Sequence, residues 1–190
     1  MDLKKYGERP YILLGPMAFL FYFIFVCLAA LSNPAWSPST GTLSNLGESN
    51  VPYTALFFNC GCFVAGTLVA ISAFGKILFQ KGTYKIAGYF FVLAGISLIM
   101  VGAITGKHEI AHDACALILF FNMGMGIVLT TAADVKAGNK LVLYSGIIIL
   151  AILLIQWPFL GEGVSECFPI AGTMAWILVQ TYKYHLEGVV

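Results

Sequence analysis

Two histidines and a glutamate stand at the spacing that zinc hydrolases use for catalysis. The segment reads His108-Glu109-Ile110-Ala111-His112, a His-Glu-x-x-His pattern. If a helix extends through it, both imidazoles lie on one face, one turn apart, and can bind a metal ion while Glu109 acts as general base. A helix N-terminus also favours the neutral imidazole that coordinates metal. The pattern therefore predicts, as one hypothesis, a zinc-dependent hydrolase.

A third metal ligand would have to come from elsewhere in the chain. Glu162 and Glu166 are four residues apart and are the candidates for it, while Glu48 and Asp113 are candidates to orient the ligands. A five-residue pattern is a weak signal, and these acidic residues all fall in predicted loops. We favour a structural interpretation, in which histidines and carboxylates pair and cap helices. A non-catalytic metal or anion site is a further alternative, so we lean against an enzyme.

The composition identifies the class of protein that carries these residues. The chain has 190 residues, of which 59% are apolar and only 10% are Asp, Glu, Lys or Arg. An ordinary soluble domain has about 25% charged residues. The formal net charge of +1 excludes a nucleic-acid-binding surface. We therefore predict an all-α polytopic integral membrane protein.

Six stretches meet or approach the roughly 20 apolar residues that a helix needs to cross a bilayer. We predict spans at residues 11–31, 55–75, 86–105, 114–133, 141–160 and 167–182, in a single domain covering 1–190. Pro169 is expected near the start of the last span, where its missing N–H does little harm. The connections are short except for a long loop, 32–54, which is rich in Ser, Asn, Pro and Gly. This loop predicts turns rather than another helix, with Ser44 or Asn45 as a cap and Gly47 at a positive φ angle.

The positive charges predict the orientation. With a cytoplasmic N-terminus, nine of the ten Lys and Arg residues lie on the cytoplasmic side and only Lys107 lies outside. The acidic residues that fall on the outer side are Glu48, Glu109, Asp113, Glu162 and Glu166. We predict a cell-membrane protein with both termini in the cytoplasm and a rim of His and acidic residues facing outward.

Small and polar residues inside the spans indicate packing. Gly88, Gly95 and Gly102 recur every seven residues, a stripe that allows close approach of a neighbouring helix. A hinge or a groove for a lipid chain is the less favoured alternative. Asn59 is assigned first to an interhelical hydrogen bond and second to ligand binding. No predicted span has a charged residue in its middle, which argues against transport driven by ion gradients.

The five cysteines give no metal or redox spacing. Cys115 and Cys167 both fall near the outer ends of their spans, so a disulfide between them is geometrically allowed. Free thiols that pack as small apolar side chains are the favoured interpretation.

Three short motifs resemble a known family. They are Leu43-Ser44-Asn45-Leu46-Gly47, Phe58-Asn59 and His112-Asp113. With them, the chain resembles the prokaryotic membrane proteins grouped as domain of unknown function 998. The resemblance implies a six-helix integral membrane protein over nearly the whole chain. It matches Ser44, Gly47, Asn59 and His112 to recurrent positions but not His108, and it implies no chemistry.

Three functions stay open. The first is a polar pocket on the outer rim that binds a lipid headgroup, a small ligand or a partner. Its candidate ligand-binding residues are Ser44, Asn45, Glu48, Asn59 and Asp113. Membrane lipid is favoured, because Gly-lined helices below the rim can accept acyl chains. The second is the metal-dependent hydrolase, acting at the outer leaflet with zinc. The third is an accessory subunit that packs against another membrane protein.

Overall fold

The regular structure of the described residues is entirely helical. The computed structural model describes residues 3–39, 41–105, 108–155 and 162–189. Its long helices are α1 (Leu3–Ser32), α3 (Thr54–Phe79), α4 (Gly82–Ala103), α5 (Glu109–Lys136), α6 (Lys140–Ile155) and α7 (Glu162–Leu186). A one-turn helix, α2 (Ser44–Gly47), lies in the loop between α1 and α3. Each predicted span coincides with a long helix, although residues 156–160 of the fifth span lie outside the described part.

Four helices are long and apolar enough to cross a membrane, counted within the described residues. They are Gly7–Ser32 of α1, and α3, α4 and α5 over their whole lengths. This confirms the all-α class, and the four apolar helices are consistent with an integral membrane protein. The number of spans and the orientation of the termini stay predictions.

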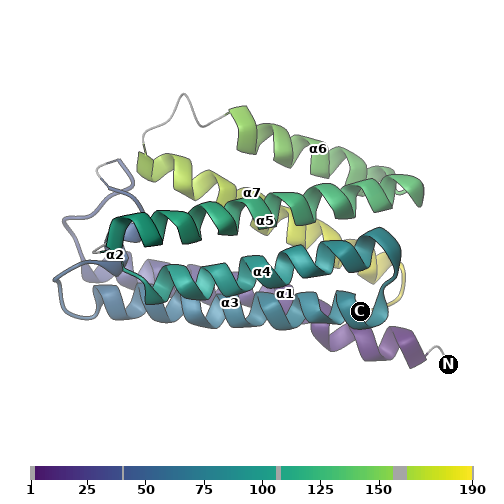
Figure 1. The fold of residues 1–190 in the computed structure, drawn as a ribbon, viewed down its shortest axis with the longest axis horizontal. Coiled ribbons are helices and arrows are strands. Elements are labelled where there is room, and N and C mark those ends of the chain that lie inside the picture. Colours follow the sequence, from purple (N-terminus) through teal and green to yellow (C-terminus); the bar gives the residue numbers. More distant parts are fainter. Residues whose placement is uncertain (1–2, 40, 106–107, 156–161, 190) are drawn as a thin grey trace.

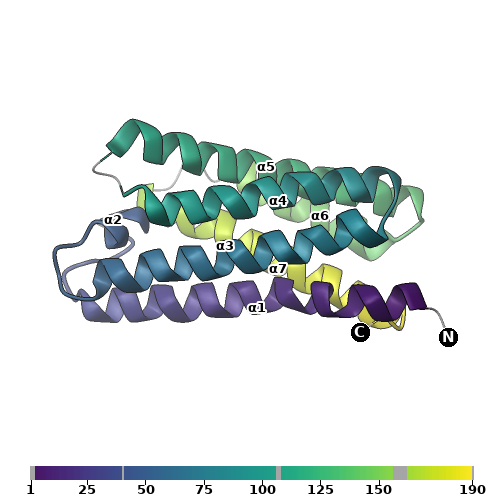
Figure 2. The same cartoon turned by 60° about the horizontal axis from the view of Figure 1, so that its bottom comes forward.

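The long helices form a closed ring. In chain order each packs against the next, and α7 returns to contact α1. α1, α3, α4 and α5 make up one layer, with α6 and α7 behind it (Figure 2). Both termini lie at one end of the ring, which we call the terminal end (Figure 1). The loop with α2 covers the opposite end, which we call the loop end.

The glycine stripe of α4 packs against α3, as predicted. A Cβ atom on Gly95 would lie 2.6 Å from the carbonyl oxygen of Gly66, and one on Gly102 would lie 2.7 Å from the Cβ of Cys62. Both distances are too short for real carbon atoms, so only glycine permits this approach. Gly124 of α5 also resembles a packing glycine in sequence, but within the described chain no atom of a neighbouring helix lies within 4 Å of its Cβ position.

Two expectations about local structure were wrong. The loop was expected to form turns only, yet it contains α2. Pro169 was expected near the start of its helix, but α7 begins at Glu162 and Pro169 is inside it. Because proline has no N–H, Pro169 removes one helical hydrogen bond in the part of α7 that faces the loop end.

Candidate functional site

The loop between α1 and α3 closes the loop end of the ring by burying two leucines. Leu43 and Leu46 are 6% and 0% exposed and pack with Phe58 and Cys62 of α3. Burial of a leucine side chain stabilises by about 1.5–3 kcal/mol relative to exposure in water. The loop is therefore a fixed part of the core and can position side chains for a site.

Local hydrogen bonds hold the loop in this shape. The Thr42 N–H donates to Asn45 Oδ1 (2.8 Å), and the Asn45 N–H donates to Thr42 Oγ1 (3.3 Å). The Trp36 indole N–H donates to the Thr42 carbonyl oxygen (2.9 Å). Asn45 thus caps the turn that precedes α2, as predicted. It is exposed and lines neither of the two cavities described below.

Gly47 is required by close packing. The predicted positive φ angle was wrong, because Gly47 is not among the positive-φ residues of the described chain. A Cβ atom on Gly47 would instead lie 2.7 Å from Asn59 Oδ1. The Asn59 amide N–H donates to the Gly47 carbonyl oxygen (3.3 Å). Asn59 therefore joins α3 to α2, which is the first of its two predicted roles.

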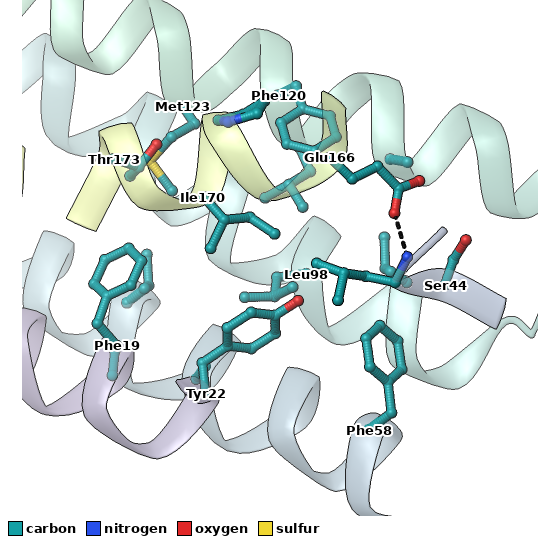
Figure 3. A pocket seen from close by; sticks show the side chains of 18 of the residues that line it. Phe19, Tyr22, Ser44, Phe58, Leu98, Phe120, Met123, Glu166, Ile170 and Thr173 are labelled. Atoms are coloured by element: carbon teal, nitrogen blue, oxygen red, sulfur yellow. Dashed lines mark hydrogen bonds between the residues drawn. The ribbon is translucent and has the colours of Figure 1, made fainter. Parts of the chain in front are cut away.

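A cavity of about 100 Å³ lies beneath the loop and is lined by residues of α1, α3, α4, α5 and α7. Its wall is mostly apolar. Leu98, Phe120 and Ile170 surround its middle, and Phe19 of α1 and Met123 of α5 lie at its far end from the loop (Figure 3). We call this space the loop-end cavity. It is a mostly apolar space whose loop end is formed by the loop and by parts of α5 and α7.

Three of the sequence-predicted residues border the loop-end cavity. They are Ser44 of α2, His112 of α5 and Glu166 of α7. Glu166 Oε2 accepts a hydrogen bond from the Leu43 N–H (2.8 Å; Figure 3). Ser44 Oγ lies 2.8 Å from Thr42 Oγ1. Three polar side chains therefore lie at the loop end of a mostly apolar cavity.

His112 has a defined tautomer. It is 6% exposed, and its Nδ1 lies 2.7 Å from the Ile104 carbonyl oxygen at the end of α4. A carbonyl oxygen only accepts, so Nδ1 carries the proton and donates. The neutral ring then has its lone pair on Nε2, and the protonated ring can donate from both nitrogens. His112 can thus serve a ligand as acceptor or as donor.

The other predicted residues lie away from this cavity. His108 is exposed and immediately precedes α5, while Glu109 and Asp113 are exposed in its first turns. Glu48 follows α2 and is only partly buried. The side chain of Glu162 lies outside the described part of the chain.

The structure therefore does not place the two histidines together. The helix was expected to continue back through His108, but α5 begins at Glu109. His108 is exposed, whereas His112 is buried. Among the described residues, no group of three or more His, Cys, Asp or Glu side chains could hold a metal ion. The zinc hydrolase stays a prediction that no described geometry favours.

The cysteines are free thiols. Cys115 and Cys167 are both half-buried and are not joined by a disulfide. They pack beside the apolar cluster of the loop end, as the favoured interpretation expected.

Sequence reasoning missed two polar residues that line the cavity. Tyr22 of α1 directs its ring into the cavity, and Thr173 of α7 lies at the cavity's far end from the loop (Figure 3). A single polar atom on an apolar helix gives no periodic signal. Finding Tyr22 and Thr173 requires knowing which face of α1 and which face of α7 point into the ring.

A larger omission is a charged cluster at the terminal end. Asp134 of α5 is fully buried and accepts hydrogen bonds from Lys183 Nζ (2.5 Å), the Tyr84 hydroxyl (2.5 Å) and Gln180 Nε2 (3.2 Å). The predicted fourth span ended at residue 133, one position too early to include this carboxylate. Buried charges therefore do occur in the ring, near its terminal end. The absence of charge from the middle of the predicted spans is then a weaker argument against ion-coupled transport.

Comparison with known families agrees with the motifs. The family described as "Protein of unknown function (DUF998)" matches residues 16–182. The chain belongs to this family. The match covers the loop, α3 to α6 and most of α1 and α7, and so includes every residue that borders the loop-end cavity. No curated protein and no solved structure shows significant similarity to this DUF998 chain.

Proposed function

We propose that this chain is a six-span protein of the cell membrane with both termini in the cytoplasm and the loop end outside. The predicted spans support this proposal, because each corresponds to a helix and the helices lie side by side. The distribution of Lys and Arg supports the orientation, since cytoplasmic segments carry an excess of both.

We further propose that the loop-end cavity binds an amphiphilic lipid. The observation that carries this proposal is the division of the cavity, with Ser44, His112 and Glu166 at its loop end and mostly hydrocarbon along the rest, apart from Tyr22 and Thr173. An engineered apolar cavity of about 150 Å³ binds benzene. A cavity of about 100 Å³ therefore has room for a short hydrocarbon segment, and the polar end is suited to a headgroup.

The headgroup determines the selectivity of such a site. An acyl chain that leaves the bilayer for an apolar cavity gains little, because lipid tails are as apolar as leucine. Polar contacts at the loop end must then supply most of the preference for one lipid. His112 and Ser44 can each donate and accept, and Glu166 contributes negative charge. The expected headgroup carries hydroxyl or amine donors as well as acceptors.

Photo-crosslinking with an alkyl-diazirine lipid in reconstituted vesicles tests this proposal. We expect labelling of the cavity wall at Phe120, Met123 or Ile170. The variant His112→Ala is expected to reduce this labelling several-fold. His108→Ala is the matched control, because it removes an exposed histidine at the same end and should leave labelling unchanged. Labelling confined to outward-facing residues, or equal loss in both variants, would contradict the proposal.

A further inference from the structure

A second cavity lies in the terminal half of the ring. It has a volume of about 60 Å³ and is lined by α1, α3, α4, α5 and α7. It shares Val69 and Met123 with the loop-end cavity, and its other lining residues are different. We call it the terminal-end cavity. Tyr11, Phe91 and Ile177 form part of its apolar wall.

Two residues of its wall each carry a buried polar atom that has no hydrogen-bond partner within the described chain. These atoms are the indole N–H of Trp176 and the Oε1 atom of Gln180, in residues that are 2% and 5% exposed. The Gln180 amide cannot turn to solve this, because its Nε2 donates to Asp134 Oδ2. A buried polar group without a partner costs about 1–3 kcal/mol. One unpartnered donor and one unpartnered acceptor therefore belong to residues that line the same cavity.

Two oppositely charged side chains, Glu8 and Lys76, line the terminal-end cavity. Glu8 is 5% exposed, and its Oε1 accepts a hydrogen bond from Gln80 Nε2 (2.6 Å). Lys76 Nζ donates to the Tyr184 hydroxyl at 3.4 Å, a long contact that leaves two of its three N–H groups for other acceptors. No ion pair within 4.0 Å joins Lys76 to Glu8 in the described part of the chain. Ionisable residues inside membrane proteins usually pair with each other or mark a substrate site.

We propose that the terminal-end cavity binds a small zwitterion, in which a primary ammonium and an anionic oxygen group are joined by a short carbon link. The ammonium would donate to Glu8 and to Gln180 Oε1. The anionic oxygens would accept from Lys76 and from the Trp176 N–H. One molecule would thus satisfy both unpartnered atoms and both charges.

The volume sets the size of this ligand. One water molecule needs about 10–15 Å³ on a comparable measure, so about 60 Å³ holds roughly four to six such positions. That is the scale of an amino group, a short carbon link and part of a phosphate or carboxylate. The same chemistry occurs in free phosphoethanolamine and in the headgroup of phosphatidylethanolamine.

Calorimetric titration of the full chain with phosphoethanolamine tests the proposal. The protein is held in phosphatidylcholine nanodiscs, and phosphocholine is the matched ligand because its ammonium has no N–H donors. A parallel arm incorporates increasing phosphatidylethanolamine and measures the unfolding midpoint. Saturable binding of the free compound identifies a soluble zwitterion, whereas stabilisation only by the lipid identifies a headgroup. Either result supports the site.

Variants connect the binding to the cavity. Trp176→Phe removes only the unpartnered N–H and keeps an aromatic ring, so affinity should fall about tenfold. Trp36→Phe is the matched control, because its N–H is already bonded to Thr42, and affinity should not change. Glu8→Gln should weaken binding at least as much as Trp176→Phe. Lys76→Arg, which keeps the charge, should retain more binding than Lys76→Gln.

Three outcomes would overturn the proposal. The first is no effect of either ethanolamine compound on the folded wild type, which would leave water as the occupant. The second is equal affinity for phosphocholine and phosphoethanolamine. The third is unchanged binding in a folded Trp176→Phe variant. Because the loop-end cavity is also proposed to bind a lipid, stabilisation by phosphatidylethanolamine is assigned to the terminal-end cavity only if Trp176→Phe removes it and His112→Ala does not.

Discussion

The variant Lys183→Met is expected to lower the free energy of unfolding strongly, because it breaks a charged cluster at the terminal end of the ring. Asp134 on α5 is fully buried and is bonded to Lys183 of α7 and Tyr84 of α4. Lys183 is only 6% exposed and also lies over the Tyr84 ring, 5.0 Å from its centroid. The three side chains therefore connect three helices through one ionic centre.

The magnitude follows from what each change leaves behind. Lys183→Met leaves the Asp134 carboxylate buried without its counter-charge, which costs about 3–5 kcal/mol. Tyr84→Phe removes one hydrogen bond to a charged acceptor and should cost about 1.5–3 kcal/mol. The double variant Asp134→Leu/Lys183→Met removes both charges, and replacing a buried ion pair with apolar groups is often close to neutral. A double-mutant cycle should therefore give a coupling energy of about 2 kcal/mol or more.

Unfolding by SDS in mixed micelles, followed by helical circular dichroism, measures these differences. Lys136→Met is the matched control, because Lys136 is an exposed lysine in the last turn of α5. That change should alter the unfolding free energy by no more than about 0.5 kcal/mol. The reasoning is refuted if Lys183→Met costs as little as this control. It is also refuted if the double variant costs the sum of the two single variants.

Three further predictions concern the packing and the cavities. Gly95→Val should destabilise the α3–α4 contact by about 1–3 kcal/mol, whereas Gly124→Val should not, and SDS unfolding compares the two. Glu166→Ala should cost about 1–3 kcal/mol by leaving the Leu43 N–H without its acceptor, and amide hydrogen exchange of the loop should rise. Met123→Trp should fill space in both cavities and so reduce both diazirine labelling and phosphoethanolamine binding. If the variant keeps wild-type labelling and wild-type binding, Met123 does not line both cavities.

The helices were predictable from the sequence because apolar runs and glycine spacing act locally. Each span appeared as an apolar stretch and overlaps one long helix. The bounds agree less well, because α1 begins at Leu3, well before residue 11, and α4 ends at Ala103, before residue 105. Gly88, Gly95 and Gly102 predicted a packed stripe correctly, since a seven-residue repeat keeps one face of a helix toward its neighbour.

The site was only partly predictable, because it depends on which residues face the interior. The His108–His112 spacing suggested a shared face, but α5 begins between them and only His112 is buried. Asp134 lay just past a predicted span and therefore looked like a solvated end residue. Its partner Lys183 is 49 residues away in the chain. No local pattern contains such a pairing.

Native mass spectrometry of the protein extracted from membranes in mild detergent tests the bound lipid most directly. The wild type should retain about one lipid per chain, identified by fragmentation. Ala116→Leu adds three carbons on the wall of the loop-end cavity and should abolish retention. Ala132→Leu makes the same change at an exposed position on the same helix and should retain the lipid. A wild type without bound lipid, or equal retention in the two folded variants, would contradict the account.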